Sequence, residues 1–438
     1  MTPSARIAGA IDLLAAIRSA PNRPADAVAA EFFRARRYIG ATDRREISER
    51  VWFVLRAWRR LNFWLGEGAS PRMLIAAAAI LQGARLSAIE ALFSGTAYAP
   101  PPLSPGERVL LARLEGRELE DPAMPEPVRL EIPDWLSPLL AARFGTELAA
   151  EMTAMAAAAP LDLRANLLKV SRDEARAALA REGVATEETP YSPWGLRAFG
   201  RYPVTAGEAF RTGLVEIQDE ASQLVALLVD ARPGMRVVDF CAGAGGKTLA
   251  LAMAMHNRGQ LVACDVSAPR LSAAARRLRR AGVHNATTHL LQPGDKWLKR
   301  HAESFARVLV DAPCTGTGTW RRNPDARLAL RHADLAELLP KQAALLDQAA
   351  RLVKPGGRLI YATCSLLLEE NEGQVRAFLQ RHAGFSLLPL EQAWPLPAGL
   401  PCPGPFLCLT PARHGTDGFF AAVLERRDAA PAKPERAA

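Results

Sequence analysis

The chain has 438 residues, more than a single typical domain requires, so we expect two or three domains. Its composition, 49% hydrophobic and 23% charged, is that of an ordinary soluble globular protein with enough apolar material for buried cores. Basic residues exceed acidic ones by 55 − 46 = 9, which favours a polyanionic partner.

The patterns of apolar residues and cysteines argue against secreted, membrane-spanning, disulfide-bonded and zinc-binding classes of protein. The apolar run over residues 7–17 is broken by Asp12, and that over residues 73–81 is too short for a bilayer, so we expect no signal peptide and no membrane span. The cysteines form neither a CxxC pair nor the Cys/His spacing of a zinc site, which argues against disulfides and a bound metal. This usage favours a reducing, cytoplasmic setting. The cysteines are Cys241, Cys264, Cys314, Cys364, Cys402 and Cys408.

The first 130 residues are almost wholly helical in pattern and are predicted to form an all-α domain, residues 1–130. Apolar residues recur at helical spacing between Ile47 and Leu61, and arginines lie mostly off that stripe. Asp43, with Glu46 three residues later, resembles a capping box that opens this helix. The apolar stripe is interpreted as core. The arginine face is either a solvated surface or a site of phosphate contact.

Residues 131–212 change to a mixed pattern and are predicted to form a small α+β linking module. Residues 161–170 include a run typical of a strand, and Ser171 with Glu174 forms a capping box for a further helix. Nothing in this module points to a particular chemistry.

From residue 213 onward short apolar runs alternate with helical stretches, which predicts a third domain over 213–428 and a disordered tail over 429–438. Such alternation is typical of a doubly wound, mostly parallel α/β sheet whose ligands bind at the carboxyl ends of the strands. The predicted strands cover residues 237–240, 260–264, 308–310 and 359–362. The predicted helices cover residues 248–255, 270–281 and 338–353.

A glycine-rich turn, VDFCAGAGGKT, joins the first of these strands to a helix. It matches neither GxxxxGK[ST] nor GxGxxG, but it places backbone N–H groups and a helix N-terminus beside a possible anionic ligand. Asp265 lies 20 residues past Gly245, at the end of the next strand, where a carboxylate could accept hydrogen bonds from ribose hydroxyls. The turn and the acid together indicate an adenosine-type cofactor, although a glycine turn also occurs without one.

Two cysteines end two strands on this same edge of the predicted sheet: Cys314 in DAPC and Cys364 in YATCS. A buried cysteine is more often a small hydrophobe than a reactive group. Two of them beside a cofactor pocket favour thiol chemistry, and the residues alone leave both eligible as the nucleophile.

Six motifs in order, QDEASQ, VDFCAGAGGKT, VDAPCTGTG, RRNPD, YATCSLLLEENE and HGTDGFF, resemble the RsmB/NOP/NSUN family of S-adenosylmethionine-dependent RNA cytosine-5 methyltransferases. The resemblance is specific over residues 213–425. Upstream, residues 32–61 are similar to the NusB-like helical domain of the bacterial RsmB branch, which acts on 16S rRNA. One departure is clear: the family's CAAPGGKT loop has Gly243 and Ala244 here in place of Ala and Pro.

The resemblance implies a Rossmann-like class I methyltransferase domain that transfers a methyl group from S-adenosylmethionine to cytosine C5 through a covalent Cys–C6 adduct. Cys364 matches the nucleophile, and Cys314 matches the thiol associated with adduct breakdown and product release. Asp311 is expected to contact the target base, and Lys247 to lie in the active site. The motif positions expected to bind the cofactor are Cys241, Ala242, Gly243, Ala244, Gly245, Gly246, Lys247, Asp265, Asp295 and Asp311.

The expected partner is RNA, which we expect to be rRNA, bound by a monomer without metal or membrane. The candidate RNA-binding residues are Arg36, Arg37, Arg44, Arg45, Arg321 and Arg322. Two alternatives stay open. The first is a non-catalytic RNA-binding ribosome-assembly factor that keeps a relic methyltransferase fold. The second is an amino-group methyltransferase, against which DAPC argues because it has Cys where those enzymes carry an aromatic residue.

Overall fold

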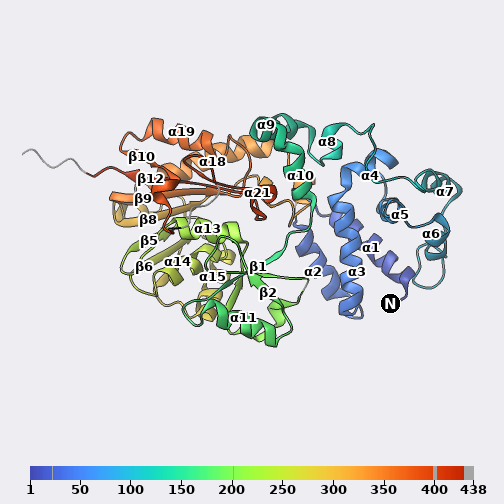
Figure 1. Ribbon diagram of the computed structural model, residues 1–438, viewed down its shortest axis with the longest axis horizontal. Helices are drawn as coiled ribbons and strands as arrows, with labels where there is room; N and C mark the ends of the chain where they lie inside the picture. Colours follow the sequence, from blue (N-terminus) through green and yellow to red (C-terminus); the bar gives the residue numbers. More distant parts are fainter. Residues whose placement is uncertain (22, 201, 398–401, 429–438) are drawn as a thin grey trace, which may run out of the picture. The chain divides into compact units, whose positions relative to one another are not determined.

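The computed structural model describes residues 1–21, 23–200, 202–397 and 402–428 (Figure 1). The tail predicted to be disordered, 429–438, lies outside the described residues. Contacts divide the chain into two units. We call Met1–Ala158 with Trp320–His332 the helical unit, and Ala159–Thr319 with Ala333–Ala438 the sheet unit.

The helical unit confirms the all-α pattern of the first 130 residues. Its core is formed by apolar faces that include Leu13 and Leu14 of the first helix, Val51 of the third and Leu74 of the fifth. The helices are α1 (Pro3–Arg18), α2 (Ala25–Ala35), α3 (Ala41–Arg56), α4 (Trp58–Leu65), α5 (Pro71–Leu81), α6 (Leu86–Leu92), α7 (Pro105–Ala112), α8 (Glu126–Arg129), α9 (Ser137–Phe144), α10 (Leu148–Ala156) and α17 (Ala326–Ala329).

The predicted capping box at the start of α3 is wrong. The helix begins at Ala41 after Gly40, so Asp43 already lies in its first turn. Asp43 and Glu46 instead bind the guanidinium of Arg6 from α1, at 2.7 Å and 2.9 Å. An arginine from the neighbouring helix offers both carboxylates charge-assisted hydrogen bonds in which donor and acceptor are both ionised.

The sheet unit begins with a small antiparallel sheet of order β2-β3-β1-β4. Its capping box is confirmed: the Ser171 side chain accepts a hydrogen bond from Glu174 N, and the Glu174 carboxylate accepts one from Ser171 N. The elements are β1 (Leu161–Ala165), α11 (Arg172–Arg181), β2 (Thr186–Glu188), β3 (Gly195–Ala198), α12 (Glu208–Arg211) and β4 (Val215–Ile217).

The main sheet has the order β10-β12-β9-β8-β5-β6-β7, with β11 paired to β12. Neighbours from β9 to β7 are parallel, and β12 pairs antiparallel with β9 and β10. The strands are β5 (Arg236–Asp239), β6 (Gln260–Asp265), β7 (Ala286–Leu290), β8 (Phe305–Asp311), β9 (Val353–Thr363), β10 (Phe385–Leu388), β11 (Leu407–Leu409) and β12 (Phe419–Arg426). The helices are α13 (Glu220–Leu228), α14 (Gly246–Ala254), α15 (Ala268–Ala281), α16 (Trp297–Arg300), α18 (His332–Ala350), α19 (Glu372–Arg381), α20 (Leu390–Ala393) and α21 (Pro411–His414).

Helices cover both faces of this sheet, as its strands require (Figure 1). Successive residues of β5 point to opposite faces. Val237 packs in the cluster formed with α13 and α14, whereas Val238 packs in the cluster formed with α18 and α19. Strands buried on both sides read as continuous apolar runs, which is why the sequence revealed β5, β6, β8 and β9. The predicted doubly wound, mostly parallel fold is confirmed.

Candidate active site

The carboxyl ends of β5, β6, β8 and β9 border a cavity of about 570 Å³. This is the edge where doubly wound sheets bind their ligands. The lining residues come from the turn after β5, from the strand ends and from α15 and α18. They are Phe240, Cys241, Ala242, Gly243, Ala244, Asp265, Val266, Arg270, Leu291, Asp311, Ala312, Pro313, Cys314, Leu345 and Cys364.

The glycine-rich turn after β5 depends on two left-handed residues. Gly243 and Gly245 have φ of +53° and +82°, where a side chain would be strained. A Cβ on Gly245 would also come within 3.0 Å of the Cβ of Ala274 on α15. Glycine is therefore favoured at residue 243 by conformation alone and at residue 245 by both conformation and close packing, and the turn leads directly into α14 at Gly246.

Two arginines hold the carbonyl groups of this turn. Arg277 of α15 donates a hydrogen bond to Ala244 O at 2.7 Å, and Arg164 of β1 donates one to Gly246 O at 3.1 Å. Arg164 also donates to Gln218, a residue of the QDEASQ motif. Ala244 stands where the family carries proline, so the chain has lost one restraint on φ. The two arginine contacts fix the turn on either side of Gly245.

Asp265 ends β6 with both carboxylate oxygens already oriented by the backbone. Oδ2 accepts a hydrogen bond from Gly243 N at 2.8 Å, and Oδ1 accepts one from Ser267 N at 2.8 Å. Each oxygen keeps a lone pair for a further donor. Next to it Val266 is 76% exposed and lines the cavity, an apolar surface suited to a planar ring. These residues fit an adenosine-containing cofactor: Asp265 for the ribose hydroxyls and Val266 for the adenine.

Asp239, the last residue of β5, is buried beside this turn. Its Oδ2 accepts a hydrogen bond from the Thr248 hydroxyl at 2.7 Å, while Oδ1 has no hydrogen-bond partner among the described residues. Burial away from water raises the pKa of Asp239 from 3.8 to about 7. The folded protein therefore retains this proton in a pH range where the unfolded chain releases it.

The stability of the protein is expected to fall as pH rises from about 4 to about 7, because the folded state binds one more proton than the unfolded state within that window. Replacing Asp239 with Asn removes the titration and should flatten this part of the profile by roughly 2–4 kcal/mol. Urea unfolding of both proteins at pH 4.5 and 7.5 measures the effect. An equal change in the free energy of unfolding between these two pH values in both proteins would show that Asp239 is ionised throughout.

Asp311 and Lys247 form an ion pair at the cavity wall. The Lys247 ammonium lies 2.6 Å from Asp311 Oδ2, and its Nζ lies 4.9 Å from the centre of the Phe419 ring. Lys247 is 7% exposed, whereas the Asp311 side chain is 31% exposed, so the ammonium is shielded from bulk water and the carboxylate is accessible. Asp311 Oδ1 makes no hydrogen bond within the described residues and can accept one from a bound ligand.

The sulfur atoms of Cys314 and Cys364 lie 3.4 Å apart, although the residues are 50 positions apart in sequence. Both residues are half-buried and line the cavity. The hydrogen bond to Cys364, reinforced by burial, raises the pKa of the Cys314 thiol well above its usual value. Cys314 therefore keeps its proton at neutral pH and can donate it toward Cys364 Sγ.

A buried carboxylate, Glu370, fixes the two cysteine-bearing segments to each other. It accepts hydrogen bonds from Thr315 N at 2.9 Å, from the hydroxyls of Thr315 and Ser365, and from the Gln342 amide at 2.9 Å. Thr315 follows Cys314 and Ser365 follows Cys364. The sequence places Glu370 in the YATCSLLLEENE motif, but it gives no local sign of this role because Thr315 is distant in the chain.

Replacing Glu370 with alanine is expected to lower the free energy of unfolding by about 3 kcal/mol, because several buried donors lose their acceptor at once. Any reaction that uses both thiols should slow as well, since the spacing of the two sulfur atoms depends on this carboxylate. Glu369→Ala is the matched control: the neighbouring carboxylate has Oε2 buried with no hydrogen-bond partner in the described part of the chain. Denaturant unfolding of both variants gives the comparison, and equal losses would refute the assigned role of Glu370.

Several predicted site residues lie outside the cavity lining. Gly245 and Gly246 belong to the glycine-rich turn but do not line the cavity. Lys247 does not line it either, but it binds the lining residue Asp311. Asp295 binds Trp297 N at 2.8 Å and His289 at 2.6 Å, contacts that lower the pKa of its carboxyl. The sequence missed four lining residues that carry no motif of their own: Val266, Arg270, Leu291 and Leu345.

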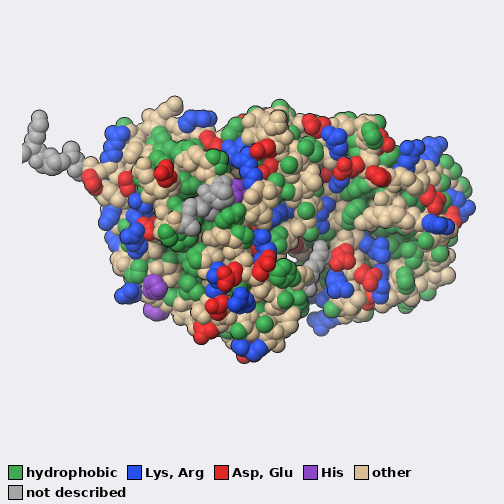
Figure 2. All heavy atoms as spheres, viewed as in Figure 1, with side chains coloured by type: hydrophobic (Ala, Val, Ile, Leu, Met, Phe, Trp, Pro, Cys, Tyr) green, Lys and Arg blue, Asp and Glu red, His purple; other side chains and the backbone are tan. Residues whose placement is uncertain are grey.

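The predicted RNA-binding arginines all belong to the helical unit. Arg37 and Arg45 are exposed, Arg36 is half-buried, and Arg44 donates to Ile39 O at 2.8 Å. Arg321 is buried at 5% exposure, which leaves it little surface for a phosphate. Figure 2 shows lysine and arginine side chains interspersed with acidic ones on the visible face, and they do not gather into one continuous basic patch there.

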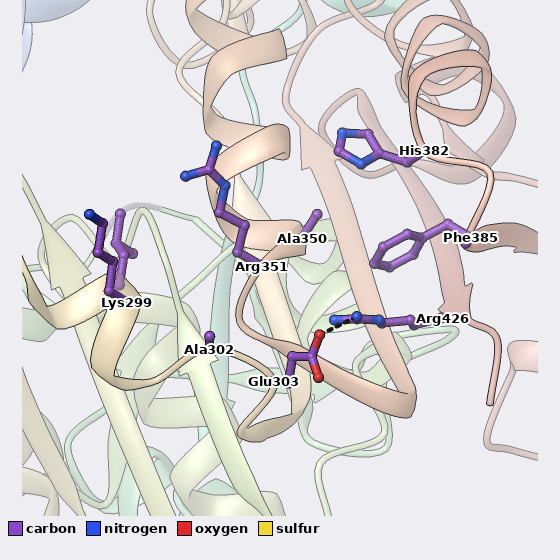
Figure 3. Close-up of a pocket in the computed structure, with 10 residues that line it drawn as sticks. Lys299, Ala302, Glu303, Ala350, Arg351, His382, Phe385 and Arg426 are labelled. Carbon is purple, nitrogen blue, oxygen red and sulfur yellow. Dashed lines mark hydrogen bonds and ion pairs between the residues drawn. The ribbon is translucent and has the colours of Figure 1, made fainter. Parts of the chain in front are cut away.

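A second cavity of the sheet unit, of about 510 Å³, lies at the amino ends of β8 and β9 (Figure 3). Glu303 and Arg351 line it just before these strands, and Glu303 pairs with Arg426 of β12. It is separate from the strand edge that carries the cysteines.

No helix among the described residues is long and apolar enough to cross a membrane. The described part of the chain also brings no three His, Cys, Asp or Glu side chains together as a metal site.

A mostly parallel sheet covered on both faces, a glycine turn and an acid at the end of the second strand define a class I methyltransferase fold. Comparisons with known proteins narrow the class. The family model for the 16S rRNA methyltransferases RsmB/F matches residues 226–425, and that for the ferredoxin-like domain of RsmF/B-type methyltransferases matches residues 132–205.

Curated relatives and solved structures agree with these matches. A probable ribosomal RNA small subunit methyltransferase B of Synechocystis sp. is 38% identical over 67% of this chain and 66% of its own length. The ribosomal RNA small subunit methyltransferase B of Pseudomonas putida is 36% identical over 72% of this chain and 71% of its own. The crystal structure of PH0851 covers 97% of this chain and 99% of that one, with 27% identity and a TM-score of 0.78.

This chain therefore belongs to the RsmB/F family of methyltransferases, as the motifs predicted. The alignments span about two-thirds of the relatives' own length, 66% for the first of them. The cofactor is S-adenosylmethionine, and the hydrogen bonds of Asp265 and the exposed Val266 are compatible with its adenosine part.

Proposed function

We propose that this protein transfers a methyl group from S-adenosylmethionine to C5 of a cytosine in small-subunit rRNA, with Cys364 as covalent nucleophile. The observation that carries the proposal is the pair of thiols, Cys314 and Cys364, 3.4 Å apart inside the cofactor cavity. The names of the relatives, which specify small-subunit ribosomal RNA, support the choice of substrate. A ribosomal substrate also agrees with the cytoplasmic setting expected from the cysteines.

Carbon 5 of cytosine is too weak a nucleophile to accept a methyl group unaided, so the reaction begins at carbon 6. The Cys364 thiolate adds there, a C–S bond forms, and the electron pair of the C5–C6 double bond makes C5 nucleophilic. When bound, S-adenosylmethionine supplies an electrophilic methyl group on a sulfonium sulfur. The Cys314 thiol, held protonated by its environment, stabilises the Cys364 thiolate before the attack through the contact at 3.4 Å.

After methyl transfer the C5 proton must leave before the C–S bond can break. We assign this step to Cys314: its proton passes to the departing Cys364 sulfur, and its own sulfur accepts the C5 proton. The electron pair of the C5–H bond then restores the C5–C6 double bond. One proton is released to solvent when Cys364 returns to its thiolate form, so atoms and charge balance.

Asp311 and Lys247 are assigned to the target base. Asp311 Oδ1 accepts a hydrogen bond from the cytosine amino group, which uracil lacks, while Oδ2 stays with Lys247 at 2.6 Å. The Lys247 ammonium stabilises negative charge that develops on the ring when the thiolate adds. A stacked cytosine cannot reach this cavity, so the target must be unpaired or flipped out of its helix.

The two rival functions have weaker support. An amino-group methyltransferase has no use for two juxtaposed thiols, and the Asp311–Cys314 segment lacks the aromatic ring that holds an exocyclic amine. A non-catalytic assembly factor would not need to keep Asp265 oriented by two backbone donors. Detectable binding of S-adenosylmethionine in a calorimeter separates the enzyme from the relic fold.

Bisulfite sequencing of small-subunit rRNA from cells with and without the gene tests the proposal. The account predicts one or more cytosines that resist bisulfite only when the gene is present, and that lose this protection when Cys364 is replaced by alanine. Identical protection patterns in all three strains would refute rRNA cytosine-5 methylation as the function.

A further inference from the structure

One cavity of the helical unit takes no part in the chemistry above. Its volume is about 830 Å³. Its floor includes Ala5, Ala8 and Gly9, small residues that recur on one face of α1. Two tyrosines also border it: Tyr38 in the turn after α2, and Tyr98 in the loop between α6 and α7.

These two rings are unusually open to solvent. Tyr38 is 74% exposed and Tyr98 is 85% exposed, and the chain contains only 5 tyrosines. Aromatic side chains normally bury most of their surface, so two exposed rings beside one cavity are a candidate binding surface. Among nucleic-acid-binding proteins, exposed aromatic rings of this kind stack on unpaired bases.

The backbone conformation of Tyr98 is strained. Its φ is +67°, a left-handed value that is costly for an aromatic residue. The surrounding loop is nevertheless ordered by hydrogen bonds from Gly95 N to Pro100 O and from Ala99 N to Thr96 O. Strain that the surrounding structure maintains at an exposed ring is typical of a functional site.

The charged side chains near the cavity suit a nucleotide ligand. The Arg36 guanidinium lies 3.9 Å from the centre of the Phe32 ring and makes no ion pair among the described residues. Arg37 follows Arg36 in sequence; it is exposed outside the cavity lining and makes no ion pair within the described part of the chain. These groups can bind the phosphates that flank a base. The one carboxylate in the lining, Asp12, can accept a hydrogen bond from a base amino group.

We propose that this cavity binds an unpaired nucleotide of the substrate RNA, with the base stacked on Tyr38 and Tyr98 and the phosphate held by Arg36 and Arg37. The inference rests on the proposed RNA substrate and adds a second, non-catalytic contact to it. The two contacts would explain how the chain recognises a particular region of rRNA beyond the target cytosine.

A 12-nucleotide single-stranded RNA that carries one 2-aminopurine tests the site, with the full-length protein. Stacking should quench the 2-aminopurine fluorescence on binding. The double variant Y38A/Y98A should bind roughly 5- to 100-fold more weakly, without quenching. Y38F/Y98F, which keeps the rings, should bind within about twofold of the parent if stacking carries the affinity.

Two further variants separate binding from folding. Tyr98→Gly relieves the left-handed strain, so its melting temperature should not fall although its RNA affinity does. Val109→Ala, an exposed apolar position on α7 of the same unit, should change neither property. Cofactor affinity, measured by calorimetry, should stay constant in every variant because these residues belong to another unit.

Unchanged RNA affinity in Y38A/Y98A would overturn the inference, as would equal losses in the alanine and phenylalanine variants or no binding of the oligonucleotide by the parent. Loss of affinity for ribonucleoprotein but not for naked RNA would assign the cavity to a protein partner and also reject it. The proposed function is tested separately: cytosine methylation with an unaffected KM in Y38A/Y98A would leave the function standing without this site.

Discussion

Replacing Cys364 with alanine should lower the rate of methyl transfer by about 10⁴-fold or more, because the proposed mechanism assigns the bond to carbon 6 to this thiol. The variant should still bind S-adenosylmethionine, since the glycine turn and Asp265 are untouched. Transfer of a radiolabelled methyl group to under-methylated small-subunit RNA measures the rate. No covalent protein–RNA band should appear on a denaturing gel.

Cys314→Ala should give the opposite result on the same gel. Addition at carbon 6 and methyl transfer remain possible, but the proton transfers that release the product are lost, so a protein–RNA adduct should accumulate. The half-buried Cys408, which lies outside the cavity, provides the control, and Cys408→Ala should behave like the parent protein. Adduct accumulation in Cys364→Ala but not in Cys314→Ala would exchange the assigned roles.

Asp265→Ala should weaken S-adenosylmethionine binding by about 100-fold or more. The carboxylate is assigned two hydrogen bonds to the ribose, each worth about 1.5–3 kcal/mol when one partner is charged. It also accepts hydrogen bonds from Gly243 N and Ser267 N, so its loss loosens the glycine turn. Isothermal titration calorimetry with the cofactor measures the dissociation constant directly.

Asp265→Asn provides an intermediate case, because one amide oxygen can still accept a hydrogen bond while the charge is removed. Glu187→Ala, an exposed carboxylate on β2, should leave cofactor affinity unchanged. Wild-type affinity in Asp265→Ala would contradict the placement of the ribose at this residue.

The parts of the fold that the sequence revealed are those with local causes. The runs that became β5, β6, β8 and β9 are apolar because both faces of a central parallel strand are buried. The edge strand β7 (ATTHL) was not predicted, because half-exposed positions give it no apolar run. The strand β12 was also not predicted, although residues 419–424 form a buried apolar run; what that run does not encode is its antiparallel pairing with β9 and β10.

The candidate site likewise has residues that the sequence predicted and contacts that it did not predict. Asp311, Cys314 and Cys364 were found because each follows a recognisable strand and belongs to a motif. The contacts of Arg164 and Arg277 to the glycine turn were not found, because each arginine approaches from a distant element. The start of α3 was misplaced for a related reason: Arg6 attracts the carboxylates that a local pattern assigned to a cap.

The measurement that tests the account most directly is the identity of the methylated nucleoside. Small-subunit RNA from a strain that lacks the gene is incubated with the purified full-length protein and radiolabelled S-adenosylmethionine, then digested to nucleosides and separated by chromatography. The account predicts label in 5-methylcytidine with the parent protein and none with Cys364→Ala. Label in N4-methylcytidine or N6-methyladenosine, or label that persists in Cys364→Ala, would contradict it.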